Sequence, residues 1–288
     1  MVKVAEAGLI DTETCIAKEE FKRKSNEKAE EEWKGKVMHG QFLRQLPEGA
    51  DIKQTFAWMG KMDLKPETEA LICAAQEQAL RTNYVKYNID KTAESPLCRL
   101  CATNGESVGH IISECSKLAQ KEYKRRHDNV ARIVHWELCE KFSLTRAERW
   151  YEHQPEGVVE NDEVKLLWDI KIQCDQVIEH HRPDIVVVNK QEKSCLIIDI
   201  ACPGDQRIIL KEGGKIENYT DLKTQLFKLW SLKTIDIVPI VVGSLGAVSK
   251  KLGDYIKKLG LSTQIALLQK TALLGTARIL RRVLQMPT

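Results

Sequence analysis

The stretch Arg182–Asp205, RPDIVVVNKQEKSCLIIDIACPGD, contains the pattern that decides the fold of this 288-residue chain. Two apolar runs, IVVV and CLII, flank the polar turn NKQEK. Runs of β-branched residues bounded by turn residues are typical of strands, so the stretch predicts a β-hairpin. A turn that is symmetric about residues 191 and 192 would place Asp184 directly opposite Asp199.

These two carboxylates predict a site for a divalent cation. Opposed residues of an antiparallel pair have Cβ atoms about 5 Å apart, and two carboxylates that close repel each other unless a cation lies between them. Because Mg²⁺ takes carboxylate and phosphate oxygens together, Asp184 and Asp199 are candidate ligands for Mg²⁺ or Mn²⁺. The alternative is a hairpin with two solvated acids. The isoleucines around Asp199 favour the metal site, since an unpaired charge is costly there.

A second pattern, CRLCATNGESVGHIISEC, has the spacing C-x2-C-x8-H-x4-C. Three thiolates and one imidazole complete a tetrahedral Zn²⁺ site. The predicted zinc ligands are Cys98, Cys101, His110 and Cys115. The alternative is four unrelated core residues. The other six of the nine cysteines have no CxxC partner, and we interpret them as buried thiols.

Residues 116–142 predict a long helix with one apolar stripe. The first half of this helix carries a cluster of side chains that could contact phosphates: Lys121, Lys124, Arg125, Arg126 and His127. A solvated helix face would show the same pattern. Residues 247–288 contain eight Lys or Arg and one acid, which also favours a polyanionic partner, although the whole chain has a net charge of only +3.

The remaining patterns predict a mixed sheet covered by helices. KLLWDIKIQCD, residues 165–175, alternates as a half-buried strand does, and Asp169 and Asp175 in it are further acids near the site. Residues 211–232 predict a helix from which Lys211 and Lys215 could reach the hairpin. IDIVPIVVG, residues 235–243, predicts a strand whose proline favours either a sheet edge or a bulge. We expect further helices at 66–85, 248–259 and 263–284, and a solvated helix or frayed segment before residue 34.

Composition places the chain among soluble globular proteins, with 43% hydrophobic and 30% charged residues. The first thirty residues are rich in charge and do not resemble a signal peptide, and the longest apolar stretch is broken by Pro239 and two glycines. We therefore expect a nuclear or cytoplasmic protein with reduced thiols and no membrane partner. No P-loop, dinucleotide fingerprint or Ser-His-Asp arrangement is visible.

RPDIVVV, followed by IIDIACPGD and a downstream lysine, resembles the PD-(D/E)xK nuclease signature. KVMHGQFLRQ, CRLC with its His and Cys, KRRHDNVARIVHW and IVPIVVGSLGAV extend this likeness. Together they resemble the C-terminal region of site-specific non-LTR retrotransposon polyproteins, of the type-1 retrotransposable element kind. In that family the signature lysine is displaced onto a later helix, and here residues 200–201 after Asp199 likewise lack it. KRRHD resembles the RH-plus-Asn block of the family, with Asp128 where Asn is usual.

The resemblance implies a restriction-like endonuclease that nicks target DNA, so that the free 3′ end can be extended by a polymerase. It implies structural zinc in the knuckle, Mg²⁺ at Asp184 and Asp199, and Lys215 as the displaced lysine, with Lys211 as second choice. The element's RNA is a further candidate partner, and a reverse transcriptase domain is expected upstream in the parent polyprotein. This chain has no Asp-Asp dipeptide of the kind that such polymerases use.

Four regions are expected. They are a helical N-terminal linker region at 1–95, a CCHC zinc knuckle at 96–117, a basic helical linker at 118–155 and a restriction-like endonuclease domain at 156–288. Two other functions remain open from the sequence. One is a catalytically silent, zinc-dependent nucleic-acid-binding module, and the other is a protein-interaction scaffold that keeps the nuclease fold for structure alone.

Overall fold

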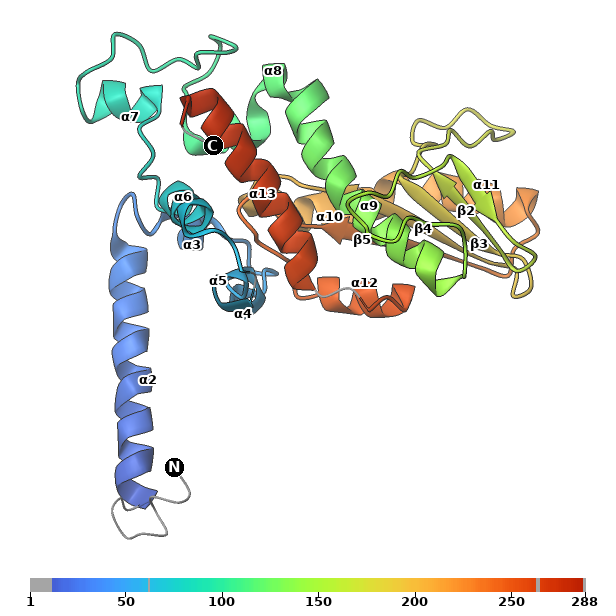
Figure 1. Ribbon diagram of the computed structural model, residues 1–288, viewed down its shortest axis with the longest axis horizontal. Helices are drawn as coiled ribbons and strands as arrows, with labels where there is room; N and C mark the ends of the chain where they lie inside the picture. The colour runs from blue at the N-terminus through green and yellow to red at the C-terminus, as the bar shows by residue number, and fades with distance from the viewer. Residues whose placement is uncertain (1–11, 62, 263–264, 287–288) are drawn as a thin grey trace.

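The computed structural model describes residues 12–61, 63–262 and 265–286. The protein is mixed α/β, about half helical, and its described part contains one five-stranded sheet (Figure 1). The strands are β1 (Val158–Glu160), β2 (Val164–Trp168), β3 (Ile185–Asn189), β4 (Ser194–Ala201) and β5 (Thr234–Val241), in the order β1-β2-β3-β4-β5. The first four form an antiparallel meander, and β5 runs parallel to β4 at the edge, one of the two alternatives that its proline favoured.

The predicted hairpin is β3 and β4. Val188 pairs with Cys195 and Ile185 with Ile198, and one further step of this register brings Asp184 opposite Asp199. The turn closes because the side-chain oxygen of Asn189 accepts hydrogen bonds from the backbone N–H groups of residues 191 and 192. The prediction that both acids lie side by side is therefore confirmed.

The strand predicted over residues 165–175 is wrong beyond Trp168. Asp169 adopts a left-handed conformation with φ 49°, which ends β2, and its N–H donates to the carbonyl oxygen of Asp184. The chain then leaves the sheet, and Ile172 bonds to His181 within the loop. The alternation of residues 170–174 therefore reflects a loop that covers the sheet, since Ile172 packs in the core on that side.

Helices cover both faces of the sheet. One face packs against α9 (Lys124–Lys141), α12 (Leu252–Leu259) and α13 (Ile265–Leu284), and the other against α10 (Ile208–Asn218) and α11 (Thr220–Leu229). Successive residues of a strand point to opposite faces. Ile198 and Ile200 therefore join the α9 core, whereas Ile197 joins the core with Leu222 and Leu226 of α11. The predicted helix over 211–232 is present as α10 and α11, which meet at Tyr219.

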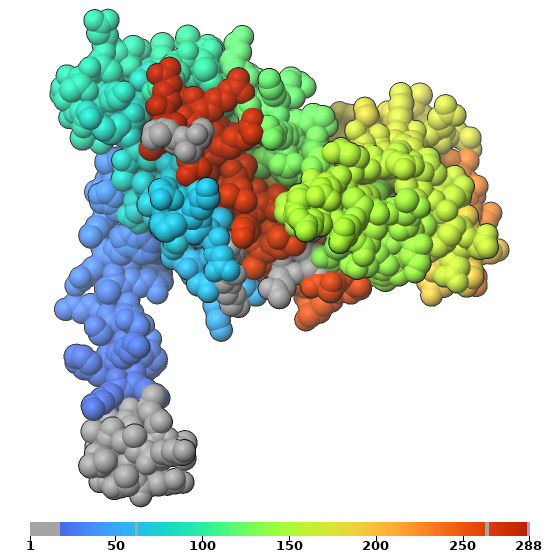
Figure 2. Space-filling model, in the orientation of Figure 1, coloured from blue at the N-terminus to red at the C-terminus, as the bar shows by residue number. Residues whose placement is uncertain are grey.

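A second core joins the N-terminal part of the chain to the segment with the CCHC residues, 96–117. Helix α2 (Thr12–Gly35) projects as an exposed arm (Figures 1 and 2), and α6 begins at Pro66 as predicted but ends at Gln76. The short helices here are α3 (Gln41–Gln45), α4 (Ile52–Thr55), α5 (Trp58–Lys61), α6 (Pro66–Gln76) and α7 (Asn83–Asn88). This core contains Ile72 of α6, Cys98 and Cys115 of the CCHC segment, and Val283 of α13.

The long helix predicted over residues 116–142 is confirmed in extent but is not uniform. It consists of a short α-helical turn, α8 (Ser116–Leu118), a π-helical turn, η2 (Ala119–Tyr123), and α9, and a separate π-helical turn, η1 (His110–Glu114), precedes it. Helix α9 packs on the sheet, and α13 packs in both cores. Each core therefore combines residues from regions that we expected to be separate along the sequence. A short 3-10 turn, η3 (Asp205–Arg207), precedes α10. Of the two C-terminal helices, α12 starts four residues later than expected, and residues 263–264 lie outside the described part.

No helix in the described ranges is both long enough and apolar enough to cross a membrane.

Candidate functional site

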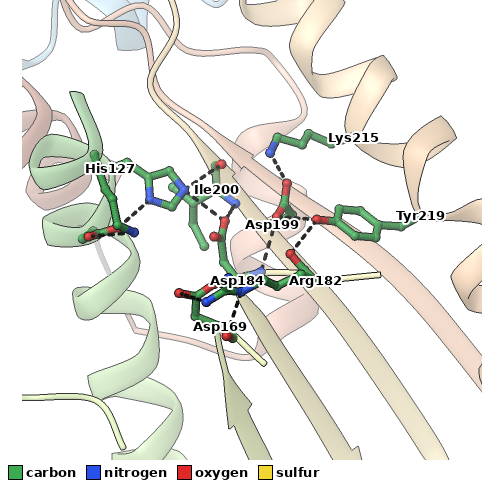
Figure 3. A network of polar contacts seen from close by, with 10 residues as sticks. His127, Asp169, Arg182, Asp184, Asp199, Ile200, Lys215 and Tyr219 are labelled. Atoms are coloured by element: carbon green, nitrogen blue, oxygen red, sulfur yellow. Dashed lines mark hydrogen bonds and ion pairs between the residues drawn. The ribbon is translucent and has the colours of Figure 1, made fainter. Parts of the chain in front are cut away.

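The two acids of the hairpin are each held by a different cation (Figure 3). Asp199 is 2% exposed; its Oδ2 pairs with the ammonium of Lys215, and its Oδ1 accepts a hydrogen bond from the hydroxyl of Tyr219 at 3.0 Å. Asp184 Oδ2 accepts from the backbone N–H of Ile200 at 2.7 Å and lies 3.1 Å from Nε2 of His127. Asp184 directly precedes β3 and Asp199 lies in β4, and helices α9, α10 and the α10–α11 junction supply their partners.

The surroundings shift the pKa values of the two carboxyl groups in opposite directions. Burial raises the pKa of Asp199 to about 6, and the charge of Asp184 acts in the same direction, against the attraction of Lys215. Burial would also raise the pKa of Asp184, but the hydrogen bond and charge of His127 and the Ile200 N–H hold it below the ordinary value. Asp184 is therefore the firmly ionised member of the pair.

His127 belongs to this site. Burial would lower its pKa, but hydrogen bonds to Asp128 and Asp184 outweigh burial and raise the pKa to about 10. Its Nδ1 lies 3.0 Å from Asp128 and its Nε2 also approaches the carbonyl oxygen of Ile200 at 3.2 Å. A charged imidazole donates from both nitrogens, so His127 fixes Asp184 from the side of α9. We predicted a phosphate contact here; the structure instead places this ring against the acid.

The structure distinguishes the two candidate lysines, Lys215 and Lys211, because only the first lies at the acid pair. Lys215 reaches Asp199 from the last turn of α10, whereas Lys211, one turn earlier, is exposed and contacts neither acid within the described chain. Tyr219, at the end of the same helix, was missed as a site residue. Its spacing of four from Lys215 was visible in the sequence and puts both side chains on one helix face.

Of the other acids considered near the site, Asp169 forms a paired contact with Arg182, with Nε 2.8 Å from Oδ1 and an Nη 3.0 Å from Oδ2. This pair joins the end of β2 to the start of the hairpin, beside the site. Asp175 is exposed and lies in the loop after β2. Neither acid has a contact to Asp184 or Asp199 through its side chain in the described structure.

The predicted phosphate-binding cluster is only partly at the surface. Lys121, Lys124 and Arg125 are exposed and line a shallow hollow of about 320 Å³ together with Arg132. Lys124 also pairs with Asp128 at 3.3 Å.

The prediction of Arg126 as a surface contact is wrong, because its side chain is 1% exposed. It donates to the hydroxyl of Thr276 at 2.9 Å and to the carbonyl oxygen of Cys202 at 3.0 Å. Arg126 lies four residues before Val130 on the apolar stripe of α9, and this spacing was the signal that could have revealed its burial.

The CCHC residues converge as a group that could hold a metal ion. Their four donor atoms lie within 4.8 Å of one another. Cys98 and Cys115 have sulfurs 3.9 Å apart, and the Cys101 sulfur lies 3.3 Å from Nε2 of His110. Tetrahedral zinc with the usual bond lengths separates two sulfurs by about 3.8 Å and a sulfur from a nitrogen by about 3.5 Å. The residues therefore fit a tetrahedral metal.

Two neighbours shape this cluster. The hydroxyl of Tyr123 accepts from the backbone N–H of Cys115 at 3.0 Å and donates to the carbonyl oxygen of Ile111 at 2.7 Å, which fixes the turn that carries the fourth ligand. Hydrogen bonds from Thr103 and from the backbone of Asn104 lower the pKa of Cys101 to about 5. A thiolate is the ligand form of cysteine, so Cys101 is prepared for a metal.

No protein-family model matches this chain, and no curated protein matches it.

Proposed function

We propose that the chain is a metal-dependent DNA endonuclease of the PD-(D/E)xK type, corresponding to the nicking domain of a non-LTR retrotransposon polyprotein. The observation that carries this proposal is the meeting of Asp184, Asp199 and Lys215 at one point of the sheet (Figure 3). Two acids on opposed strands and a lysine from the next helix are the group that this chemistry needs, and the displaced lysine agrees with the family resemblance.

Asp184 and Asp199 would hold Mg²⁺ or Mn²⁺. Such an ion, when bound, lowers the pKa of a coordinated water and neutralises charge on a phosphate. Asp199 would exchange its ammonium partner for the cation, because an acid among isoleucines needs a positive neighbour of some kind. Asp184 is ready to ligate, since His127 and the Ile200 N–H keep it ionised and oriented.

Lys215 would then be released from Asp199 and could donate to the phosphate. An ammonium placed where negative charge develops stabilises the transition state of phosphate cleavage. Tyr219 would hold the remaining oxygen of Asp199, so that only one side of that carboxylate turns toward the cation. Each of the five side chains would therefore have its own role. The two acids would ligate the ion, Lys215 would stabilise negative charge, and His127 and Tyr219 would orient the two acids.

The knuckle would hold Zn²⁺ in a structural role. Its three thiolates and one imidazole fill a tetrahedron and leave no open position for a substrate. Lys121, Lys124 and Arg125, exposed on the helical segment after the knuckle, would neutralise phosphates of the bound DNA. The hollow they line extends to Asp128, which contacts His127 of the acid site, so phosphate contacts and cleavage would be close together.

The test is nicking of supercoiled plasmid by the full chain in zinc-containing buffer. Mg²⁺ and Mn²⁺ should each produce the open-circular form, and the reaction without a divalent ion should produce none. Ca²⁺ should support DNA binding without cleavage, because its looser coordination positions water poorly. An RNA of equal length, added as competitor, measures whether the DNA is preferred.

A second candidate is a catalytically silent nucleic-acid-binding module. It is favoured by one observation: both acids already have cationic partners, Lys215 and His127, so the site is electrostatically satisfied by the chain itself. In this case the plasmid would bind in a salt-dependent way and would remain supercoiled with every metal. The nicking assay and a binding assay on the same preparation distinguish the two functions.

A further inference from the structure

A third group of metal-binding side chains lies on α9 and in the loop that follows it. His135 and Cys139 are one helical turn apart, and His153 lies in the segment between α9 and β1. All three are buried, with exposed fractions of 0%, 0% and 4%. Their donor atoms lie within 4.8 Å of one another, and the group shares no residue with the knuckle or with the acid pair.

The distances in this group approach those of a zinc site. The Cys139 sulfur lies 3.5 Å from Nδ1 of His135, and that nitrogen lies 2.8 Å from Nε2 of His153. Tetrahedral zinc separates a sulfur from a nitrogen by about 3.5 Å and two nitrogens by about 3.3 Å. The thiol and the first imidazole therefore already have the required separation, and the second imidazole must move by about half an ångström.

We propose that Nδ1 of His135, Sγ of Cys139 and Nε2 of His153 form a second Zn²⁺ site. His153 and Glu156 line a surface hollow of about 260 Å³. A water molecule or the carboxylate of Glu156 would supply the fourth ligand from this hollow. Zinc accepts both thiolate and imidazole, whereas hard cations such as Mg²⁺ prefer oxygen, so the donor set selects zinc over the ion of the acid site.

Hydrogen bonds within the chain leave one polar atom of this group without a partner among the described residues. The N–H of Ala147 donates to Nδ1 of His153 at 3.4 Å, which places the ring proton on Nε2, where it donates to His135. Nε2 of His135 must then carry a proton, and it is buried without a hydrogen-bond partner among the described residues. A buried donor without a partner costs about 1–3 kcal/mol. Metal binding through Nδ1 of His135 would leave this Nε2–H as it is and would give up the long bond from Ala147, so the gain would come from the three ligand bonds alone.

A metal at this site would stabilise the packing of α9 against one end of the sheet. His135 packs edge to face against Trp168 of β2, with ring centroids 5.3 Å apart, and its ring also stacks on His153. A metal would therefore join α9 to the loop before β1 and would fix the ring of His135 against Trp168 at the end of β2. The same Trp168 precedes the turn at Asp169 that leads to the acid pair, so the metal would support the hairpin indirectly.

The experiment is a metal count on the full chain, purified after expression with added zinc. Wild type should carry two zinc ions per chain by elemental analysis. Cys139→Ser and His153→Gln should each carry one, and so should Cys101→Ser of the knuckle. Cys195→Ser, which removes a buried thiol from the opposite face of the sheet, is the matched control and should keep two.

Cobalt substitution keeps the inference testable if a variant fails to fold. Thiolate-to-cobalt absorption increases with the number of thiolates, so wild type titrated with Co²⁺ should show two phases, one about three times as intense as the other. One zinc per wild-type chain, together with a single cobalt phase, would overturn the proposal. An unchanged count of two in both Cys139→Ser and His153→Gln would also overturn it.

Discussion

At the scale of single residues, Asp199 determines the electrostatics of the site. Its neighbours in β4 are isoleucines, its opposite residue is another acid, and its pKa is raised from 3.8 to about 6 mainly by burial. A buried acid with a raised pKa binds its proton more tightly when folded than when unfolded. The folded state therefore loses stability as pH rises from about 4 to about 6 when no divalent metal is present.

Asp199→Asn should remove this pH dependence. Without added divalent metal, the free energy of unfolding of the variant relative to wild type should increase by about 1–3 kcal/mol between pH 4 and pH 7, since two pKa units correspond to roughly this energy. Urea unfolding at several pH values measures it. Asp175→Asn, at an exposed acid, is the control and should give a constant difference. Parallel pH curves for wild type and Asp199→Asn would contradict the burial argument.

Lys215 and Lys211 form a matched pair for testing the role of the ammonium. Lys215→Ala should lower the nicking rate about 100-fold, because a charge-stabilising donor contributes about 3 kcal/mol to the transition state. Lys211→Ala should leave the rate unchanged, since Lys211 is exposed and contacts neither acid in the described chain. DNA affinity should be equal for both variants. Loss of activity in Lys211→Ala alone would assign the lysine role to that residue.

At the scale of elements, the sequence predicted those features that depend on local spacing. The β3–β4 register follows from the length of the NKQEK turn and the side chain of Asn189, and the convergence of Cys98, Cys101, His110 and Cys115 follows from their spacing. The end of β2 was missed, because the alternation of residues 170–174 is equally compatible with a loop that covers apolar surface.

The partners of the acids depend on how helices pack, which local patterns do not specify. His127 meets Asp184 only because α9 crosses the sheet at that point, 57 positions away in the sequence. For the same reason the buried position of Arg126 and the cluster of His135, Cys139 and His153 were not predicted. A spacing of four along α9 relates Arg126 to Val130 and His135 to Cys139, but such a spacing by itself identifies no partner.

The knuckle should be required for the second core. Cys101→Ser should lose one zinc and lower the thermal midpoint by several degrees, because Cys98 and Cys115 pack in the same core as Ile72 and Val283. Zinc analysis and a melting curve measure both effects. Cys174→Ser, at a half-buried thiol outside both metal clusters, is the control and should change neither. A zinc-free variant with an unchanged melting curve would show that the knuckle is not a folding element.

At the scale of the whole molecule, internal pairing reduces the basic charge available to a nucleic acid. Residues 247–288 contain eight Lys or Arg, but Arg278 and Arg282 both pair with Glu122, and Lys258 pairs with Asp236 at 2.9 Å. The exposed cations next to the acid site are mainly Lys121, Lys124 and Arg125, which line the hollow of about 320 Å³. DNA should therefore bind across η2 and the start of α9.

Salt dependence of binding should identify that surface. Replacing Lys121, Lys124 and Arg125 together with Ala should reduce the slope of log affinity against log salt by about 2 to 3, since each phosphate contact contributes about 0.9. The control is the equally charged triple replacement of Lys22, Arg23 and Lys24 on the projecting helix α2 (Figure 2). That variant should have a nearly unchanged slope. Equal slopes for both triple variants would place DNA elsewhere.

The central claim is that Asp184 and Asp199 hold a catalytic divalent ion, and one comparison tests it directly. The measurement is the single-turnover rate of plasmid nicking in Mg²⁺ by wild type and Asp184→Ala, at equal DNA affinity and with the fold verified by circular dichroism. We predict that wild type nicks the plasmid and that Asp184→Ala leaves it supercoiled, while the exposed-acid control Asp175→Ala matches wild type. Nicking by Asp184→Ala at the wild-type rate would contradict the claim.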